Sequence, residues 1–244
     1  MWRCKDCDWT SSEHLAVCQN CGTWGSLVSD TVAAGPRNVV PPRARGALIS
    51  TKDLARLDRP SLPLSPTWKG LFGSLPSCFG MMVYGPPGGG KSHWLMLLAA
   101  ELARFAPVLY VASESGQSNA TIQMVQRLEV YSDKILVSSA ISAAEIFADL
   151  STCNARFLIV DSLTCVPDLS LVALSEIAEK ERLGVAFSLH VTKTGTYRGQ
   201  SHWAHWVDIT ARIEDHALTL EKNRFGPLQS ARLEYAAEPE GVVT

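Results

Sequence analysis

Short apolar runs separated by amphipathic stretches dominate the chain from about residue 46 onward. Four of these runs have the length of buried strands: residues 81–84, 108–112, 157–160 and 185–189. The stretches between them repeat apolar residues at helical spacing and predict helices at about residues 91–105, 119–128, 142–150 and 169–182. Ser142 and Glu145 have the spacing of a capping box, which marks a helix start. Strands that alternate with helices predict a mostly parallel sheet covered on both faces.

The pattern changes after about residue 206. Residues 207–213, 217–220 and 231–235 alternate apolar and polar positions, as strands with one buried face do. Because no helix separates these segments, we expect antiparallel strands at one edge of the sheet.

The first 45 residues have a different character from the rest. Residues 1–30 form a compact unit bounded by cysteines, and residues 31–45 hold three prolines and no periodic apolar pattern. The second segment therefore predicts a semi-extended linker. The remaining residues, 46–244, suit one medium-sized domain.

Composition and charge narrow the class of protein. Hydrophobic residues make up 46% of the chain, which is enough for a buried core, and the net charge is only −2. A nucleic-acid surface must therefore be a local basic patch. No stretch reaches the roughly 18 apolar residues that cross a membrane, and the N-terminus lacks the apolar core of a secretory signal. We expect no membrane partner.

Cysteine spacing indicates a metal site. Cys4 and Cys7 form one C-x2-C pair, and Cys18 and Cys21 form a second. Four thiolates at this spacing can converge tetrahedrally on one Zn²⁺, whose binding would supply the folding free energy of so small a unit. The alternatives are iron in the same site and four cysteines without a metal. A metal cluster of this kind, with no disulfide framework, is typical of a reducing cytosol and predicts a cytoplasmic protein.

A phosphate-binding loop follows the first predicted strand of the core. The segment GPPGGGKS at residues 85–92 fits the G-x4-G-K-[ST] pattern and lies between a strand and a helix. Its backbone N–H groups would surround the β-phosphate of ATP, Lys91 would reach the β- and γ-phosphates, and Ser92 would bind Mg²⁺. We count His93 with this site, although an ordinary place in the first helical turn is the simpler interpretation. The residues expected at the nucleotide are Gly85, Pro86, Pro87, Gly88, Gly89, Gly90, Lys91, Ser92 and His93.

Two carboxylates end the strands that would neighbour this loop. Asp161 follows the apolar strand at 157–160, where a carboxylate would hold Mg²⁺ through water. Glu114 follows the strand at 108–112, and strand ends beside the phosphate loop face the nucleotide in this topology. A carboxylate there can orient and activate the attacking water. The alternative for Glu114 is a solvated loop residue.

With these parts in place, the chain resembles the bacterial RadA (Sms) family, RecA-related ATPases of DNA recombination. The resemblance covers nearly the whole chain and rests on the four cysteines with Trp24–Leu27, the phosphate loop, and residues 110–114, 117, 158–162, 190–195, 199, 205–208 and 222–226. The pentapeptide Lys222-Asn-Arg-Phe-Gly226 is more specific to that family than the phosphate loop. The resemblance implies a RecA-like α/β ATPase core with a mostly parallel sheet, plus a small N-terminal zinc module.

The chain departs from the family pattern in three places. RadA proteins continue into a Lon-protease-like domain, whereas this sequence ends soon after Gly226, so we expect a shortened form. The residue after Ser92 is His93 instead of the usual threonine, and residues 59–79 are only loosely similar.

The resemblance also implies roles for two basic residues. RecA-like ATPases bind ATP between subunits, and by resemblance Lys222 and Arg224 would act in trans at the γ-phosphate of a neighbour in a ring, most simply a hexamer. Two residues apart on an extended segment, they project to the same side and would neutralise charge that develops during transfer. The alternative is a basic pair at the end of a strand, on a hairpin turned by Gly226 and Pro227.

Basic and aromatic residues interleave between residues 191 and 206, as a sequence-tolerant platform for single-stranded DNA requires. The candidates for DNA contact are Lys193, Tyr197 and Arg198. The hypothesis that follows is an ATP-dependent motor or recombination mediator that acts on single-stranded or branched DNA as a helicase or in branch migration. Its zinc module would contact a recombination or replication protein.

Two other functions remain open from the sequence. A KaiC-like regulatory ATPase would control a protein partner without moving along DNA, and the near-neutral charge favours it. A zinc-bearing adaptor or strand-annealing protein would bind ATP and barely hydrolyse it, but the complete set of Lys91, Ser92, Glu114 and Asp161 argues against that.

Overall fold

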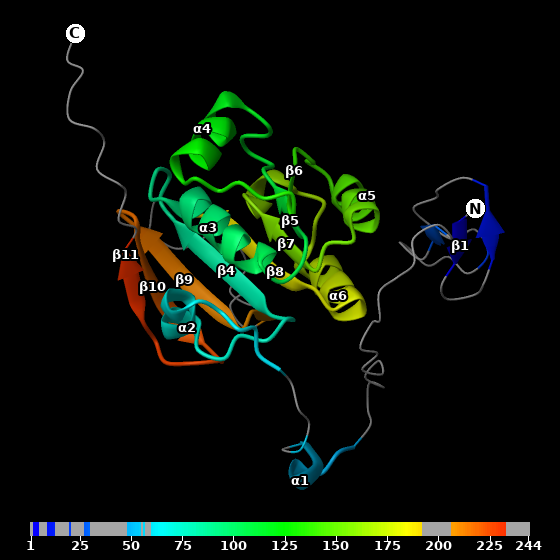
Figure 1. Cartoon of the computed structure of the whole chain (residues 1–244), viewed down its shortest axis with the longest axis horizontal. Helices are drawn as coiled ribbons and strands as arrows, with labels where there is room; N and C mark the ends of the chain where they lie inside the picture. Colours follow the sequence, from blue (N-terminus) through cyan, green and yellow to red (C-terminus); the bar gives the residue numbers. More distant parts are fainter. Residues whose placement is uncertain are drawn as a thin grey trace.

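The computed structural model describes residues 2–4, 9–12, 20, 27–29, 48–54, 56, 60–191 and 206–232. Within them, the largest unit is a twisted eight-stranded sheet with the order β11-β10-β9-β4-β8-β7-β5-β6 (Figure 1). Its strands are β4 (Gly80–Gly85), β5 (Val108–Val111), β6 (Ile135–Ser138), β7 (Phe157–Val160), β8 (Gly184–His190), β9 (Ile209–Glu214), β10 (Ala217–Asn223) and β11 (Ser230–Arg232).

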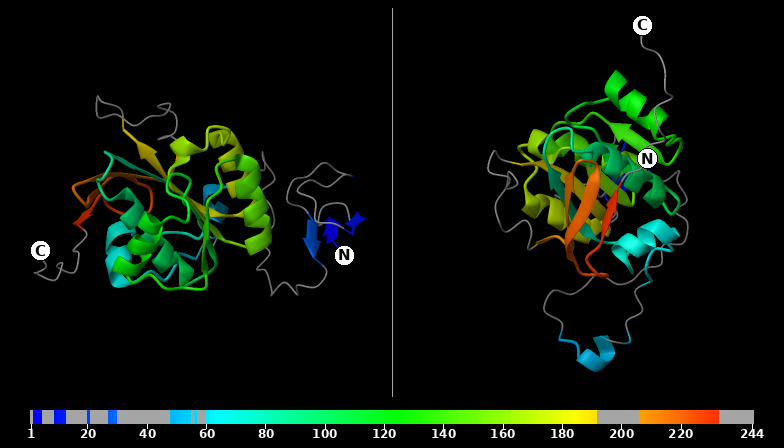
Figure 2. Two further views of the ribbon diagram at one scale, coloured as in Figure 1. Left: turned by 90° about the horizontal axis from the view of Figure 1, so that it is seen from above. Right: turned by 90° about the vertical axis from the view of Figure 1, so that its left-hand side faces the viewer.

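Helices cover both faces of this sheet (Figure 1, Figure 2). One apolar cluster packs beneath α2 (Pro66–Phe72), α3 (Lys91–Ala103) and α4 (Asn119–Arg127). A second cluster on the other face packs beneath α5 (Ala143–Cys153) and α6 (Leu171–Glu181). The short helix η1 (Leu163–Cys165) follows β7, and α1 (Thr51–Leu54) has no buried residue. Both faces of the central strands are therefore buried, which is why those strands read as continuous apolar runs.

The predicted layered α/β architecture is confirmed. The strands expected at 81–84, 108–112, 157–160 and 185–189 correspond to β4, β5, β7 and β8, which pair in parallel. The capping box at the start of α5 is also confirmed, because Ser142 Oγ accepts from the Glu145 N–H and the Glu145 carboxylate accepts from the Ser142 N–H.

Two expectations about the sheet were wrong. The prediction missed β6, an edge strand whose apolar run, Ile135 to Val137, is shorter than the roughly four to eight residues of a typical buried strand. Its residues are only partly buried, and Leu136 is exposed. The second error concerns β9, which pairs in parallel with β4 and antiparallel only with β10. The antiparallel part of the sheet therefore begins one strand later than expected.

The described residues near the N-terminus form a separate three-stranded sheet of order β2-β1-β3. Its strands are β1 (Trp2–Cys4), β2 (Thr10–Ser11) and β3 (Leu27–Ser29). The Cys4 N–H donates to the Trp9 carbonyl at 2.7 Å, and Cys4 is fully buried. The division into 1–30, 31–45 and 46–244 remains a prediction.

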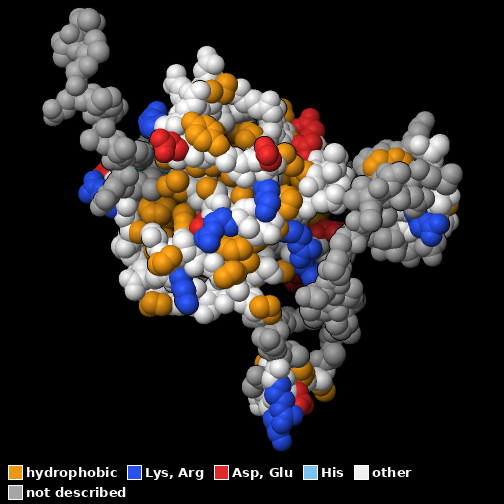
Figure 3. All heavy atoms as spheres, viewed as in Figure 1, with side chains coloured by type: hydrophobic (Ala, Val, Ile, Leu, Met, Phe, Trp, Pro, Cys, Tyr) orange, Lys and Arg blue, Asp and Glu red, His pale blue; other side chains and the backbone are white. Residues whose placement is uncertain are grey.

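No helix in the described ranges is both long and apolar enough to cross a membrane. On the face shown in Figure 3, lysine and arginine side chains lie scattered among acidic and apolar ones. This mixture agrees with the near-neutral net charge of the chain.

Candidate nucleotide site

The loop at residues 85–90 lies at the edge of the sheet where the parallel strands end. The registers of β4 with β8 and β9 place His190 and Arg212 level with the end of β4, and β5 and β7 end together at Val111 and Val160. Ligands of open α/β sheets bind outside the carboxyl ends of the strands. The loop then leads directly into α3, whose first N–H groups point toward the same region.

Glycines are required where this loop meets β9. A Cβ added at Gly85 would lie 1.9 Å from the Ile213 carbonyl oxygen, and no real Cβ tolerates such a contact. Gly90 precedes α3 as its N-cap with a φ of 98°, a conformation that L-residues with side chains rarely adopt. The backbone of the loop therefore packs directly against the backbone of β9.

Lys91 is buried inside the loop. Its Nζ donates to the carbonyls of Gly85 at 2.9 Å and Pro86 at 2.8 Å. Burial lowers the pKa of the Lys91 ammonium, and the negative charges of Asp161 and Glu114 oppose that shift. The Lys91 ammonium is thus desolvated and held in place at the end of β4. A phosphate bound there would be attracted more strongly than in water, because the surroundings screen the charge less.

Asp161 is held by hydrogen bonds from two neighbouring strands. Its Oδ2 accepts from the Tyr110 hydroxyl on β5 at 2.9 Å, and its Oδ1 accepts from the Ser188 hydroxyl on β8 at 2.5 Å. Tyr110 is fully buried, and burial together with the Asp161 carboxylate raises the pKa of its phenol well above the ordinary value. The phenol therefore stays a donor that fixes the carboxylate. The peptide bond between Asp161 and Ser162 is cis.

The residues suited to Mg²⁺ lie close together in this arrangement. The Tyr110 hydroxyl is 2.9 Å from Asp161 Oδ2 and 3.5 Å from the Ser92 carbonyl oxygen. Ser92 and Asp161 therefore flank one phenol, and both offer oxygen ligands of the kind that Mg²⁺ prefers. The donor set fits a magnesium ion that shares its coordination with phosphates.

Glu114 and His190 form a pair at the same edge. Glu114 Oε2 lies 3.1 Å from His190 Nε2, and the Glu114 side chain is 58% exposed. Glu114 follows β5 and His190 ends β8, on the two sides of β7. The expected carboxylate thus lies at the end of the sheet where the parallel strands finish, and a histidine contacts it.

Sequence reasoning missed several residues of this site. Ser188 lies in an apolar strand, and a lone serine there gives no signal of its contact with Asp161. His216, in the turn after β9, contacts the phosphate loop and packs edge-to-face on His93 with ring centroids 6.2 Å apart. Burial lowers the pKa of His93, with further lowering from Arg127 and His216, while Asp161 opposes the shift.

Lys222 and Arg224 lie at the opposite edge of the sheet. Lys222 Nζ donates to the Val207 carbonyl, and Arg224 Nη1 pairs with Asp208 Oδ1 at 2.9 Å. Burial lowers the pKa of Lys222, and the neighbouring Arg224 adds to this effect, while Asp208 opposes it. The chain that follows them docks on the end of α2, where the Phe225 carbonyl accepts from the Ser74 N–H.

Known proteins resemble this chain in sequence and in fold. No family model matches the chain. Curated proteins named DNA repair protein RadA are similar over nearly all of it: that of Pseudomonas aeruginosa is 28% identical over 93% of this chain, that of Rickettsia bellii 26% over 91%, and that of Streptococcus pyogenes 25% over 91%. The resemblance to the RadA family is confirmed. The chain spans about half the length of these relatives, 54–55%.

Solved structures agree with the RecA-like fold that the resemblance to RadA implies. The KaiC-like protein PH0186 of Pyrococcus horikoshii matches 71% of this chain and 93% of its own, with a TM-score of 0.56 and 15% identity. The flagellar accessory protein FlaH of Methanocaldococcus jannaschii matches 73% of this chain and 96% of its own, with a TM-score of 0.50 and 14% identity. At such identities, these likenesses establish the fold alone.

Several residues of the predicted zinc module and of the predicted DNA contacts lie outside the described ranges. They are Cys7, Cys18, Cys21, Lys193, Tyr197 and Arg198. Among the residues that are described, no group of three or more histidine, cysteine, aspartate or glutamate side chains could hold a metal ion. The zinc module and the DNA contacts therefore remain predictions.

Proposed function

We propose that this chain hydrolyses ATP and uses the energy on single-stranded or branched DNA in repair or recombination, as a motor or a mediator. ATP hydrolysis is supported by one observation: Lys91, Asp161 and Glu114 lie near one another at one edge of the sheet, beside the loop at residues 85–90. The similarity to proteins named DNA repair protein RadA supports the DNA part.

The chemistry follows from the positions of these side chains. The loop N–H groups and Lys91 would bind the β- and γ-phosphates, and the positive end of α3 would favour the same anion. Ser92 and Asp161 would hold Mg²⁺, which when bound neutralises charge on the phosphates. Glu114, held at 3.1 Å from His190, would orient the water that attacks the γ-phosphate.

Lys222 and Arg224 would act on a second subunit. Their position at the edge opposite Lys91 places them far from the nucleotide of their own chain. A ring of copies, which we expect to be a hexamer, would bring this edge to the neighbour's γ-phosphate, where two cations would stabilise the transition state.

The other parts of the proposal rest on sequence and resemblance. Cys4, Cys7, Cys18 and Cys21 would bind one Zn²⁺, and the burial of Cys4 in the small β1–β3 sheet suits such a site. Lys193, Tyr197 and Arg198 would contact single-stranded DNA. The zinc module would then serve as the contact for a recombination or replication protein.

One observation favours a second candidate function. The net charge is −2, and basic side chains are dispersed on the face shown in Figure 3. A regulatory ATPase that controls a protein partner needs no basic DNA surface.

Steady-state ATP hydrolysis with and without single-stranded DNA, at low and at moderate salt, separates the two candidates. The proposal expects stimulation by DNA that weakens as salt rises, because phosphate contacts release counterions. Lys91→Ala should abolish hydrolysis, whereas the exposed Lys134→Ala should not change it. Hydrolysis that ignores DNA at both salts would select the regulatory ATPase, and turnover by Lys91→Ala would overturn the assigned site.

A further inference from the structure

The turn that joins β9 to β10 has an unusual backbone. Glu214 pairs with Ala217, so Asp215 and His216 form a two-residue hairpin loop. Their φ angles are 47° and 61°, the positive values that this type of turn requires at both central positions. Neither residue is glycine or asparagine, the residues that most favour such a turn.

This turn contacts the phosphate loop directly. The His216 N–H donates to the Gly89 carbonyl at 3.1 Å. The His216 ring lies so close that a Cβ added at Gly90 would be 2.6 Å from its Nδ1. The two loop residues that precede Lys91 therefore pack on the hairpin turn.

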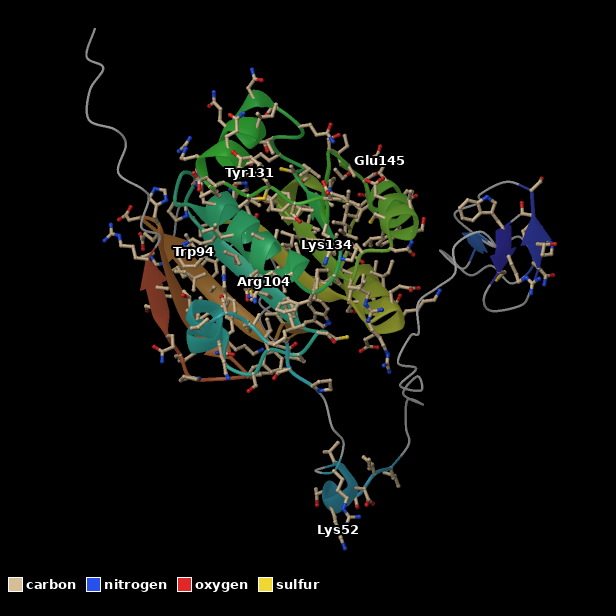
Figure 4. All side chains as sticks on the ribbon, in the orientation of Figure 1. Lys52, Trp94, Arg104, Tyr131, Lys134 and Glu145 are labelled. Atoms are coloured by element: carbon tan, nitrogen blue, oxygen red, sulfur yellow. The ribbon has the colours of Figure 1, made fainter. Side chains whose placement is uncertain are left out.

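A tryptophan of α3 also contacts this turn. Trp94 lies on α3, as labelled in Figure 4. Its Nε1 donates to the His216 carbonyl at 3.1 Å, and its side chain is only 7% exposed. The Trp94 ring packs edge-to-face on Trp68 of α2 with centroids 6.0 Å apart. Because a buried indole N–H needs a partner, this geometry fixes where the His216 carbonyl lies.

These contacts set the direction of one N–H group in the loop. In a planar trans peptide, the carbonyl and the following N–H point in opposite directions. Since the Gly89 carbonyl points at the His216 N–H, the N–H of Gly90 points away from the hairpin. The backbone N–H groups of a phosphate-binding loop are the donors that surround a bound phosphate, so an N–H turned away from the hairpin can take this role.

We propose that the Asp215–His216 turn, tied to α3 by Trp94, is a positioning element that aims the Gly90 N–H at the bound phosphate. The inference rests on the proposed ATP site and goes beyond it by assigning a role to Trp94 and His216. Neither residue touches the reacting atoms, so the loss of either should weaken nucleotide binding and spare the chemical step.

The test compares Trp94→Phe with Trp68→Phe in the full chain. Both exchange one indole of the same aromatic cluster for a phenyl ring, but only the first removes the donor to His216. We expect Trp94→Phe to raise the Kd for ATP and for ADP alike by about five-fold, the effect of one hydrogen bond, with kcat changed less than about two-fold. Trp68→Phe should leave both Kd values unchanged. His216→Gly, which keeps the positive φ but removes the ring from Gly90, should weaken binding in the same way.

The outcomes separate the two claims. The ATP site stands if the unaltered chain binds ATP and Lys91→Ala does not. The positioning role is then overturned if Trp94→Phe and His216→Gly bind ATP as tightly as Trp68→Phe does. A fall in kcat with unchanged Kd also contradicts the positioning role. If the unaltered chain does not bind ATP, the proposed function fails and this inference fails with it.

Discussion

The two ends of the β9–β10 hairpin contact different parts of the molecule. Its turn, at Asp215 and His216, contacts the phosphate loop of the same chain. Its base carries Lys222 and Arg224, which lie at the opposite edge of the sheet beside Val207 and Asp208. From His216 to Lys222 the strand covers about 20 Å, since each residue of a strand advances about 3.3 Å.

This separation determines which nucleotide each end can reach. A lysine or arginine side chain is much shorter than the strand between them, so the basic pair cannot approach the phosphate loop that its own turn supports. If Lys222 and Arg224 take part in hydrolysis, they must do so on another copy of the chain. The same hairpin would then contact the phosphate loop of its own subunit through its turn and the γ-phosphate of the next subunit through its base.

The largest expected effect comes from removing the two cations at the base. In the double variant Lys222→Ala, Arg224→Ala, kcat for ATP should fall by about 10³-fold, the scale of a cation supplied in trans, while the Kd for ATP stays unchanged. Steady-state hydrolysis and equilibrium binding measure the two quantities.

Mixing this variant with Lys91→Ala tests the trans assignment. Each protein alone should be inactive, but mixed assemblies pair an intact loop with intact cations from a neighbour, and part of the activity should return. If the mixture stays as inactive as its components, then the basic pair does not act across subunits.

The next largest effect comes from the contact between the loop and β9. Gly85→Ala would place a Cβ 1.9 Å from the Ile213 carbonyl oxygen, and the backbone on both sides must shift. We expect a loss of about 3 kcal/mol in the free energy of unfolding and a large loss of ATP binding, measured by denaturant titration and equilibrium binding. Gly70→Ala is the control, because a Cβ there meets nothing within 4 Å. Equal behaviour of the two variants would show that the loop does not pack on β9.

A smaller effect on hydrolysis is expected when the Asp161 carboxylate loses one of its hydrogen-bond donors. Tyr110→Phe removes the hydroxyl that donates to Asp161 Oδ2 and leaves the buried ring in place. Without this donor, Asp161 is less well oriented toward Mg²⁺, so kcat should fall about ten-fold and hydrolysis should require more Mg²⁺. The exposed Tyr131→Phe should match the unaltered chain in both measurements. A Tyr110→Phe variant with normal magnesium dependence would contradict the positioning of Asp161 by Tyr110.

The part of the fold that the sequence predicts correctly is local. The strand before the phosphate loop, the glycines of the loop and the capping box at Ser142 all follow from residues close together in the chain. The edge strand β6 escaped prediction because its apolar run, Ile135 to Val137, is too short to distinguish a strand from a loop. The direction of β9 escaped because it depends on pairing with β4, which is far away in sequence.

The candidate site also has a part that local sequence patterns predict and a part that they do not. Lys91, Asp161 and Glu114 could be named because each follows a recognisable strand or glycine pattern. The contacts of Tyr110 and Ser188 with Asp161, and of Trp94 with His216, join residues 27–122 positions apart. Such partners are set by the order of strands in the sheet, which periodicity within one segment does not reveal.

The smallest expected effect is a change in the pH profile at the base of the hairpin. Burial and the nearby Arg224 lower the pKa of Lys222, so this lysine loses its charge at a lower pH than an ordinary lysine does. If the charge serves hydrolysis in a neighbour, kcat should decline on the alkaline side as Lys222 deprotonates. Lys222→Arg keeps the charge to higher pH, so its activity at neutral pH should fall only a few-fold, and its alkaline decline should move upward or vanish. Trp94→Phe, which alters the contact of α3 with the turn at the other end of the hairpin, should retain the unaltered pH profile. An alkaline limb that persists unchanged in Lys222→Arg would mean that deprotonation of Lys222 does not cause the decline, and the titration assigned to the base of the hairpin would then be wrong.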